Sequence, residues 1–302
     1  MIQAQGLTKV YGRKRAVDGA TFTVQPGRVT GFLGPIGAAK STTMRMIVGL
    51  DRPTAGTVIV GAGALAHHPA PMTEVGALLD AKAAHPGRSA RQHLLALART
   101  HGIATRRVEE VLEVTGLTQV AGQRVGKYSL GMGQRLGIAA ALLGDPHTLI
   151  LDEPVNGLDP EGVIWVRRLL RAEADRGRTV FLSSHLMAEM AQIADHVVVI
   201  GRGRILADAP IGDLLSGASS PGSRVRAARP AELAAVLQSR GIAVQHLPDG
   251  YLVAAAGPPA VAEAALAAGE LVLELAPVRS SLEDAYLALT ADEVEYRSEL
   301  VR

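Results

Sequence analysis

The sequence contains no cysteine, which excludes disulfide bonds and thiolate metal sites and fits a cytosolic protein. Aromatic residues make up only 3% of the chain, so we expect a core of aliphatic side chains and alanine. No apolar run approaches the roughly 18 residues that a membrane-spanning helix needs. The N-terminal segment also lacks the apolar stretch of a signal peptide. We therefore expect a soluble chain that is not exported.

Charge of either sign is not in excess. The chain carries 31 lysines and arginines against 29 aspartates and glutamates, a formal net charge of +2. This balance is not the electrostatic footprint of a nucleic-acid-binding protein, so we expect no nucleic-acid partner. The chain has 302 residues, of which 48% are hydrophobic, enough for one large domain or for a large and a small one.

The first two thirds of the chain alternate between strand and helix patterns. The apolar segment 28–34 predicts a buried strand, and the helical spacing of 40–50 follows it after a glycine-containing turn. Further strands are predicted at 55–61, 147–154 and 178–185, further helices at 162–177 and 187–195, and a hairpin at 196–208. The alternation predicts an α/β fold with a mostly parallel sheet, an antiparallel edge and a helical insertion over about 86–143.

A run of small residues, SGASSPGS at 216–223, predicts a linker between two domains. The pattern after it reads strand, helix, strand, strand, helix, strand over 224–275, which favours a small α+β module of the ferredoxin-like kind. A last amphipathic helix, SLEDAYLALT, follows at 281–290. We therefore expect one domain at 1–216 and an accessory C-terminal domain at 224–302.

The string GPIGAAKST at 34–42 has the outline of a phosphate-binding P-loop, G-x-x-x-x-G-K-[ST]. In such a loop, consecutive backbone N–H groups at a helix start surround phosphate oxygens. Lys40 would reach the β and γ phosphates, and the Ser41 hydroxyl would lie on Mg²⁺. The second glycine position holds Ala39, so the string alone is compatible with a working site, a decayed site or a chance match.

Two later stretches carry chemistry. TLILDEP at 148–154 is a buried strand that ends in two carboxylates; Asp152 would hold Mg²⁺ through water, and Glu153 would polarise the attacking water. In YSLGMGQ at 128–134, Ser129 and Gly131 open a long helix, whose start can face a phosphate. Serine is also an ordinary helix N-cap, so this second stretch is a weaker indication.

The order of these stretches resembles the ATP-binding cassette (ABC) proteins over residues 1 to about 215. Lys40-Ser41-Thr42 is similar to the end of Walker A, YSLGM to the signature, LILDEP to Walker B, NGLDP at 156–160 to the D-loop and SSH at 183–185 to the switch histidine. The resemblance implies a P-loop NTPase fold and the following site. Catalysis would use Lys40, Glu153 and His185; nucleotide binding Tyr11, Gly34, Gly37, Ala38, Ala39, Lys40, Ser41, Thr42, Ser129, Gly131 and Asp159; and Mg²⁺ binding Ser41, Asp80 and Asp152.

Within this family the chain resembles the cassette subunits of ABC-2-type drug and antibiotic exporters, on YSLGM, AHPGRSARQHL at 84–94 and the helix at 281–290. The resemblance implies ATP and Mg²⁺ as cofactors and a second cassette, a copy or a relative, that closes head to tail over two ATP molecules. It also implies a separate multi-span permease of ABC-2 type. The chain would then lie in the cytoplasm, peripheral on the cytoplasmic face of the membrane, and power export of a drug, antibiotic or other hydrophobic compound.

The chain departs from the family pattern at the phosphate loop and beyond it. Ile36 stands where the loop usually has asparagine, and Asp80 aligns with a glutamine that touches Mg²⁺ and relays to the membrane subunit. Ala39 replaces a glycine in a left-handed position, which costs about 1–2 kcal/mol for a residue with a Cβ. We expect an active ATPase whose ATP affinity Ala39→Gly would tighten roughly fivefold. A regulatory cassette with weak turnover, and a soluble mechanochemical ATPase acting on ribosomes or DNA, are the alternatives.

Overall fold

The computed structural model describes residues 1–35, 37–217, 222–278 and 281–290. The chain packs as two compact units, one formed mainly by Met1–Ile211 and the other by Gly212–Ala288. Across the described residues, no helix is both long and apolar enough to cross a bilayer.

The first unit is built on a six-stranded sheet with the order β5-β6-β7-β3-β8-β9. Its strands are Val29–Leu33 (β3), Val75–Leu78 (β5), Thr148–Leu151 (β6), Thr179–Ser183 (β7), His196–Gly201 (β8) and Arg204–Pro210 (β9). Neighbours from β5 to β8 are parallel, and β9 pairs antiparallel with β8. All four residues of β6 are buried, as expected for a strand covered on both faces. The predicted parallel sheet with an antiparallel edge is confirmed.

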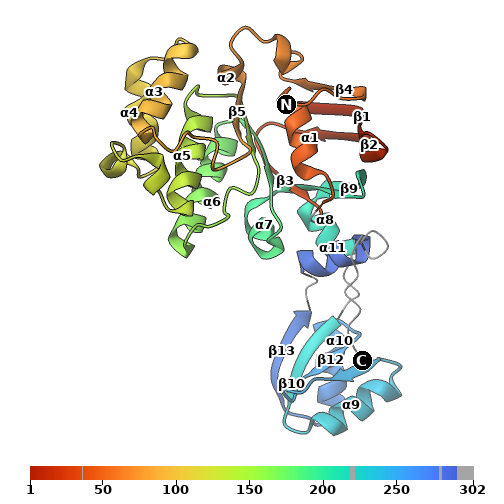
Figure 1. The fold of residues 1–302 in the computed structure, drawn as a ribbon. Helices are drawn as coiled ribbons and strands as arrows, with labels where there is room; N and C mark the ends of the chain where they lie inside the picture. The colour runs from red at the N-terminus through yellow and green to blue at the C-terminus, as the bar shows by residue number, and fades with distance from the viewer. Residues whose placement is uncertain (36, 218–221, 279–280, 291–302) are drawn as a thin grey trace. The chain divides into compact units, whose positions relative to one another are not determined.

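A second, three-stranded sheet lies in the same unit and is entirely antiparallel (Figure 1). Its strands are Ile2–Tyr11 (β1), Lys14–Val24 (β2) and Ala55–Val60 (β4), in the order β2-β1-β4. Alternating burial along β2 directs one face of this sheet into the core. The pattern of the sequence predicted β4 but not β1 and β2.

The three phenylalanines pack together where these two sheets meet. The chain has three phenylalanines, Phe22 on β2, Phe32 on β3 and Phe181 on β7, and their ring centroids lie 5.1 to 5.9 Å apart. Such aromatic pairs contribute about 0.5–1.5 kcal/mol each beyond the area they bury. The surrounding core is aliphatic, as the low aromatic content predicts.

Helices pack on the six-stranded sheet and gather beside it. The α-helices along the first unit are Lys40–Ile47 (α1), Pro71–Glu74 (α2), Ala90–Thr100 (α3), Thr105–Val114 (α4), Leu130–Leu142 (α5), Pro160–Asp175 (α6) and Met187–Ile193 (α7). Short 3₁₀ turns span Leu65–His67, Thr118–Val120 and Val125–Lys127. Helices α3, α4 and α5 lie together, away from β1, β2 and β4 (Figure 1). They occupy the predicted helical stretch. Its first helix starts with a capping box between Ser89 and Gln92.

The second unit contains a four-stranded antiparallel sheet with two helices. Its elements are Gly222–Ala227 (β10), Pro230–Ser239 (α9), Val244–His246 (β11), Leu252–Ala254 (β12), Pro258–Ala267 (α10) and Val272–Val278 (β13), and the helices Ile211–Gly217 (α8) and Leu282–Thr290 (α11) flank them in sequence. The sheet order is β11-β12-β10-β13. Helix α8 continues to Gly217 and β10 starts at Gly222, so the predicted linker 216–223 is shorter than its composition indicates. Residues 218–221 lie outside the described residues.

Candidate functional site

An open cleft of about 490 Å³ lies at the carboxyl ends of β3 and β6. Parallel pairing of β6 with β7 and of β7 with β3 brings the loops that leave these strands to one edge of the sheet. The cleft is lined by Tyr11, Lys14, Ala16, Pro35, Gly37, Ala38, Ala39, Lys40, Ser41, Thr42, Asp152 and Glu153. Most of the predicted nucleotide site is therefore brought together by this edge.

The phosphate loop connects β3 to α1 and contains a residue other than glycine in the left-handed backbone conformation. Ala39, the residue before α1, has φ 71° and ψ 24° and provides no side-chain cap. Gly37 is also left-handed, with φ 85°. A Cβ at Gly34 would lie 2.5 Å from the carbonyl oxygen of Ile200, so only glycine allows the loop to pack this close to β8. The departure at Ile36 lies outside the described residues.

Lys40 folds its side chain back over the loop. Its Nζ donates to the carbonyl oxygen of Gly34 at 2.6 Å and to that of Pro35 at 3.4 Å. Burial lowers the pKa of Lys40, and the nearby carboxylates of Glu153 and Asp152 oppose that shift. An anionic ligand in the cleft would favour the charged form of this partly buried lysine.

Asp152 is held by two hydroxyl groups. Its Oδ2 accepts a hydrogen bond from Ser41 Oγ at 2.6 Å, and its Oδ1 accepts one from Ser183 Oγ. Leu151 pairs with Leu182 in the sheet, which sets Ser183 beside the acidic pair. Ser41 and Asp152 thus place a hydroxyl and a carboxylate oxygen together, the hard donors that Mg²⁺ prefers.

Glu153 follows directly and adopts a left-handed conformation, with φ 50°. Its backbone N–H donates to Ser183 Oγ at 2.9 Å. Its carboxylate Oε2 lies 2.7 Å from Nδ1 of His185, whose backbone N–H also points to Oε2 at 3.3 Å. A strained, non-glycine backbone at a carboxylate beside an open cleft is typical of a functional residue.

Tyr11 reaches the cleft from the end of β1. Its hydroxyl donates to Asp51 Oδ2 at 3.0 Å, and Asp51 also accepts from Arg45. Nζ of Lys9 lies 5.0 Å from the centre of the Tyr11 ring. The side chain remains 49% exposed, so a face of the ring is open to a planar ligand.

The predicted site residues of the signature and the D-loop lie outside this cleft. Ser129 caps α5 by accepting from the backbone N–H of Met132 at 3.2 Å, and Asp159 caps α6 by accepting from Gly162 at 2.9 Å. Gly131 packs against the D-loop, since a Cβ there would come within 3.0 Å of the Gly157 carbonyl. The signature and the D-loop therefore adjoin one another, and their ligand roles remain predictions.

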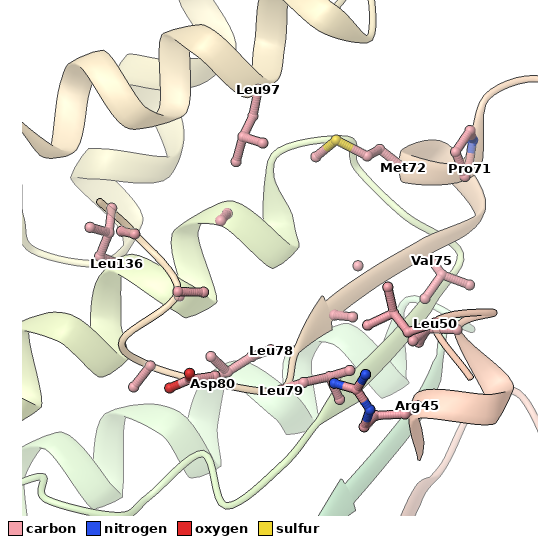
Figure 2. A pocket seen from close by; sticks show the side chains of 18 of the residues that line it. Arg45, Leu50, Pro71, Met72, Val75, Leu78, Leu79, Asp80, Leu97 and Leu136 are labelled. Carbon is pink, nitrogen blue, oxygen red and sulfur yellow. The ribbon is translucent and has the colours of Figure 1, made fainter. Parts of the chain in front are cut away.

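Asp80 is placed in a different cleft, shown in Figure 2. This second cleft has a volume of about 480 Å³ and lies between β5 and the helices α3 and α5. Its wall is mostly aliphatic, with Val75, Leu79, Leu97 and Leu136 among the residues that line it. Asp80 Oδ1 accepts from the backbone N–H of Lys82 at 2.8 Å. Asp80 lines this second cleft and not the first, and its role as a metal ligand remains a prediction.

Two residues at the site received no role from the sequence. Ser183 bonds to both Asp152 and Glu153, and Gln134 Nε2 donates to the carbonyl oxygen of Glu153 at 2.8 Å. Both belong to stretches that stand out in the sequence, SSH and the residues after the signature. Membership of those two stretches could have marked both residues as candidates. Their contacts depend on strand register and helix packing, which the sequence does not give.

The residues of the first cleft fit ATP and Mg²⁺. The N–H groups of the first turn of α1 have no partner within the helix and form a positive end beside Lys40. Ser41 and Asp152 supply the oxygen donors, and the exposed ring of Tyr11 supplies an aromatic face. This donor set matches a nucleoside triphosphate with a hard divalent cation.

Comparisons with known proteins agree with this site. A family model described as ABC transporter matches residues 17–156, and a model described as a domain of unknown function (DUF8746) matches 222–283. Over 217 residues the chain is 42% identical to the bacitracin transport ATP-binding protein BcrA of Bacillus licheniformis, covering 71% of each protein. It is 34% identical to the daunorubicin/doxorubicin resistance ATP-binding protein DrrA of Streptomyces peucetius, covering 98% of this chain and 94% of that protein.

Solved structures show the same fold. One, titled as the ATP-binding subunit of an ABC transporter, superimposes with a TM-score of 0.66 at 25% identity and covers 72% of this chain and 92% of its own. Another is the ATP-binding cassette MJ0796 in a dimeric post-hydrolysis state bound to ADP and Pi. Its TM-score is 0.64 at 22% identity, covering 70% of this chain and 99% of its own.

Proposed function

This chain belongs to the ATP-binding subunits of ABC transporters and is an ATPase, and we propose that it powers the export of a drug, an antibiotic or another hydrophobic compound. One observation carries the ATPase part of this function: a single cleft brings Lys40 together with Asp152 and Glu153. The relatives named for bacitracin transport and for daunorubicin and doxorubicin resistance favour export over a purely regulatory cassette.

In this function the phosphate loop binds the nucleotide. Lys40 and the N–H groups at the start of α1 hold the phosphates, while Tyr11 stacks on the base. Gly34, Gly37, Ala38, Ala39 and Thr42 complete the cradle. Ser41 and Asp152 would hold Mg²⁺, which neutralises charge on the phosphate oxygens when bound.

Of the two carboxylates, Glu153 is the better placed to act on water. Asp152 uses both oxygens on the hydroxyls of Ser41 and Ser183. In the described part of the chain, the contacts of the Glu153 carboxylate use Oε2, which leaves Oε1 for a water molecule. Glu153 then orients that water and accepts its proton as a general base, and His185 fixes the direction of the carboxylate.

The second half of the nucleotide site would come from another cassette. Ser129 and Gly131 stand at the start of α5, and Asp159 at the start of α6, outside the cleft of their own chain. We propose that two cassettes, two copies or a copy and a close relative, pair head to tail. The signature of one then closes on the phosphates held by Lys40 of the other.

A separate multi-span permease of ABC-2 type would be the second partner. The apolar cleft of Figure 2 suits a short amphipathic helix of that permease, because aliphatic side chains line it and Asp80 supplies an acidic edge. The resemblance also assigns Asp80 to the position that relays to the membrane subunit. The chain would then work at the cytoplasmic face of the membrane, with no role for nucleic acid.

The C-terminal residues would form an accessory domain of the ferredoxin-like kind. Two supports are the β-α-β-β-α-β order from β10 to β13 and the sheet order β11-β12-β10-β13. A core of its own, with Val225, Leu233 and Val261 fully buried, also supports separate folding. We keep the proposed limits of 1–216 for the cassette and 224–302 for the accessory domain; residues 279–280 and 291–302 lie outside the described residues.

Export is tested in cells that contain the chain and its membrane partner. The intact chain should co-purify with a multi-span membrane protein and lower the cellular content of a fluorescent hydrophobic drug. The variant Glu153→Gln should keep the membrane protein but lose the efflux. ATP hydrolysis by the purified chain without any membrane partner, and without efflux, would instead favour the mechanochemical class.

The domain limits are tested by truncation. A chain that ends at Gly217, the last residue of α8, should bind Mg²⁺-ATP with an affinity within about twofold of the full chain, since the residues that line the cleft precede it. Circular dichroism establishes that the shortened chain is folded. A folded fragment that no longer binds nucleotide would contradict the boundary.

A further inference from the structure

Gln134 is a buried polar residue in α5 with no part in the proposed chemistry. Its side chain is 3% exposed, and its Nε2 donates to the carbonyl oxygen of Glu153 at 2.8 Å. A buried amide that donates to one particular carbonyl fixes the distance between the two segments. Here the segments are the signature helix and the turn that carries Glu153.

The turn at Glu153 needs external support. Glu153 has φ 50°, a left-handed backbone conformation that costs about 1–2 kcal/mol for a residue with a Cβ. The N–H of Glu153 donates to Ser183 Oγ at 2.9 Å, and its carbonyl accepts from Gln134 and from the N–H of Asn156 at 3.1 Å. Asn156 belongs to the same turn, so it shapes the turn without anchoring it. Ser183 and Gln134 anchor it from two different elements.

We propose that Gln134 is a positioning residue for ATP hydrolysis, which holds the backbone of Glu153 so that its carboxylate faces the cleft beside His185. The inference rests on the proposed role of Glu153 as the general base. In the described part of the chain the side-chain hydrogen bond of Gln134 goes to the backbone of Glu153, so Gln134 acts through that residue. Misplacement of a catalytic group by about 1 Å can lower a rate on the order of 100-fold.

The amide is the side chain that this position requires. A carboxylate of the same length, as in Gln134→Glu, would set an acceptor against the carbonyl oxygen. A methionine, as in Gln134→Met, has similar length and volume but no N–H to donate. In Gln134→Met the carbonyl oxygen of Glu153 still accepts a hydrogen bond from the N–H of Asn156, so it is not left as a buried acceptor without a donor. Gln134→Met is therefore expected to fold.

The test compares steady-state ATP hydrolysis of the full chain with that of Gln134→Met. We expect kcat to fall about 10- to 100-fold, while KM for ATP and the dissociation constant of Mg²⁺-ATP change less than about twofold. Gln123→Met, the same change at an exposed position of the chain, is the matched control and should retain the parental kcat. Thermal unfolding of both variants checks that they are folded.

Two results would overturn the inference: a kcat for Gln134→Met within twofold of the parent, or a loss of nucleotide affinity as large as the loss of kcat. If Gln134→Met does not fold, Gln134→Asn replaces it. Its amide is one methylene shorter and should lower kcat without weakening binding, and the same two results would overturn the inference. Glu153→Gln is measured in parallel. If Glu153→Gln hydrolyses ATP at the parental rate, Glu153 is not the general base. If Glu153→Gln loses hydrolysis while Gln134→Met keeps the parental kcat, only the positioning role of Gln134 is refuted.

Discussion

Two turns at the carboxyl edge of one sheet each hold a left-handed residue that is not glycine. Ala39 follows β3 with φ 71°, and Glu153 follows β6 with φ 50°. The turn at Glu153 is anchored by side chains of Ser183 and Gln134. At Ala39 the support is local: its carbonyl accepts from the N–H and the hydroxyl of Thr43, one turn further along α1.

The difference between the turns lies in what the side chain does. The carboxylate of Glu153 contacts His185 and borders the cleft, so its strain accompanies a group that the chemistry needs. The methyl group of Ala39 packs against the core and has no polar contact to make. Loss of the side chain's chemistry should therefore abolish ATP hydrolysis at Glu153, whereas removal of the methyl group at Ala39 should leave it intact.

The largest effect is expected for Glu153→Gln. The amide keeps the size and backbone of the residue but cannot accept a proton, and loss of a general base lowers rates about 10²- to 10⁴-fold. Hydrolysis should fall by at least about 100-fold, with Mg²⁺-ATP affinity within about twofold, because Asp152 and Lys40 are unchanged. Phosphate release and nucleotide titration measure the two quantities.

The matched control for that change is Glu161→Gln, which removes an exposed carboxylate in the first turn of α6. It should hydrolyse ATP at the parental rate. Parental hydrolysis by Glu153→Gln would show that this turn carries strain without a catalytic group, and the contrast with Ala39 would fail.

Lys40→Ala should have the next largest effect, on binding. It deletes the partly buried cation of the cleft. Burial lowers the pKa of this lysine, and the carboxylates of Glu153 and Asp152 partly offset that shift. A hydrogen bond to a charged group contributes about 1.5–3 kcal/mol, so the dissociation constant of Mg²⁺-ATP should rise roughly 10- to 100-fold. Lys82→Ala, at an exposed loop position, should not change it. Equal affinity in both variants would place the phosphates elsewhere.

The parallel sheet and the order of the motifs could be predicted from the sequence. Runs such as TLIL are buried on both faces and read as strands without tertiary information. The strands β1 and β2 could not, because breaks in register, for example between Ala4 and Leu7, interrupt the alternation of buried and exposed residues that marks a strand. Their pairing also depends on contacts far apart in the chain.

The site could be predicted as a set of residues but not as a set of contacts. The motif spacing identifies Lys40, Asp152 and Glu153, and the structure places them around one cleft. The contacts of Ser183 depend on the register between β6 and β7, and that of Gln134 on how α5 packs. Asp80 aligns with a metal ligand by position in the sequence, but the chain turns it toward the second cleft.

Ala39→Gly should have the smallest effect, and the structure changes what that effect is. Ala39 has φ 71° in the folded chain, so its strain belongs to the fold itself. The fivefold gain in affinity expected from the sequence should therefore shrink to less than about twofold. The gain should appear in folding instead. Removal of the Cβ relieves about 1–2 kcal/mol, and the greater freedom of glycine in the unfolded chain offsets about 0.5–1 kcal/mol of it.

The free energy of unfolding should thus rise by about 0.5–1 kcal/mol, measured by denaturant titration of the full chain and of Ala39→Gly. Ala38→Gly is the matched control one residue earlier: Ala38 is 3% exposed and is not left-handed, so glycine there should lower the stability. If Ala39→Gly instead binds Mg²⁺-ATP about fivefold more tightly at unchanged stability, the left-handed conformation forms only on nucleotide binding. The two turns would then differ in when they become strained, not only in what supports them.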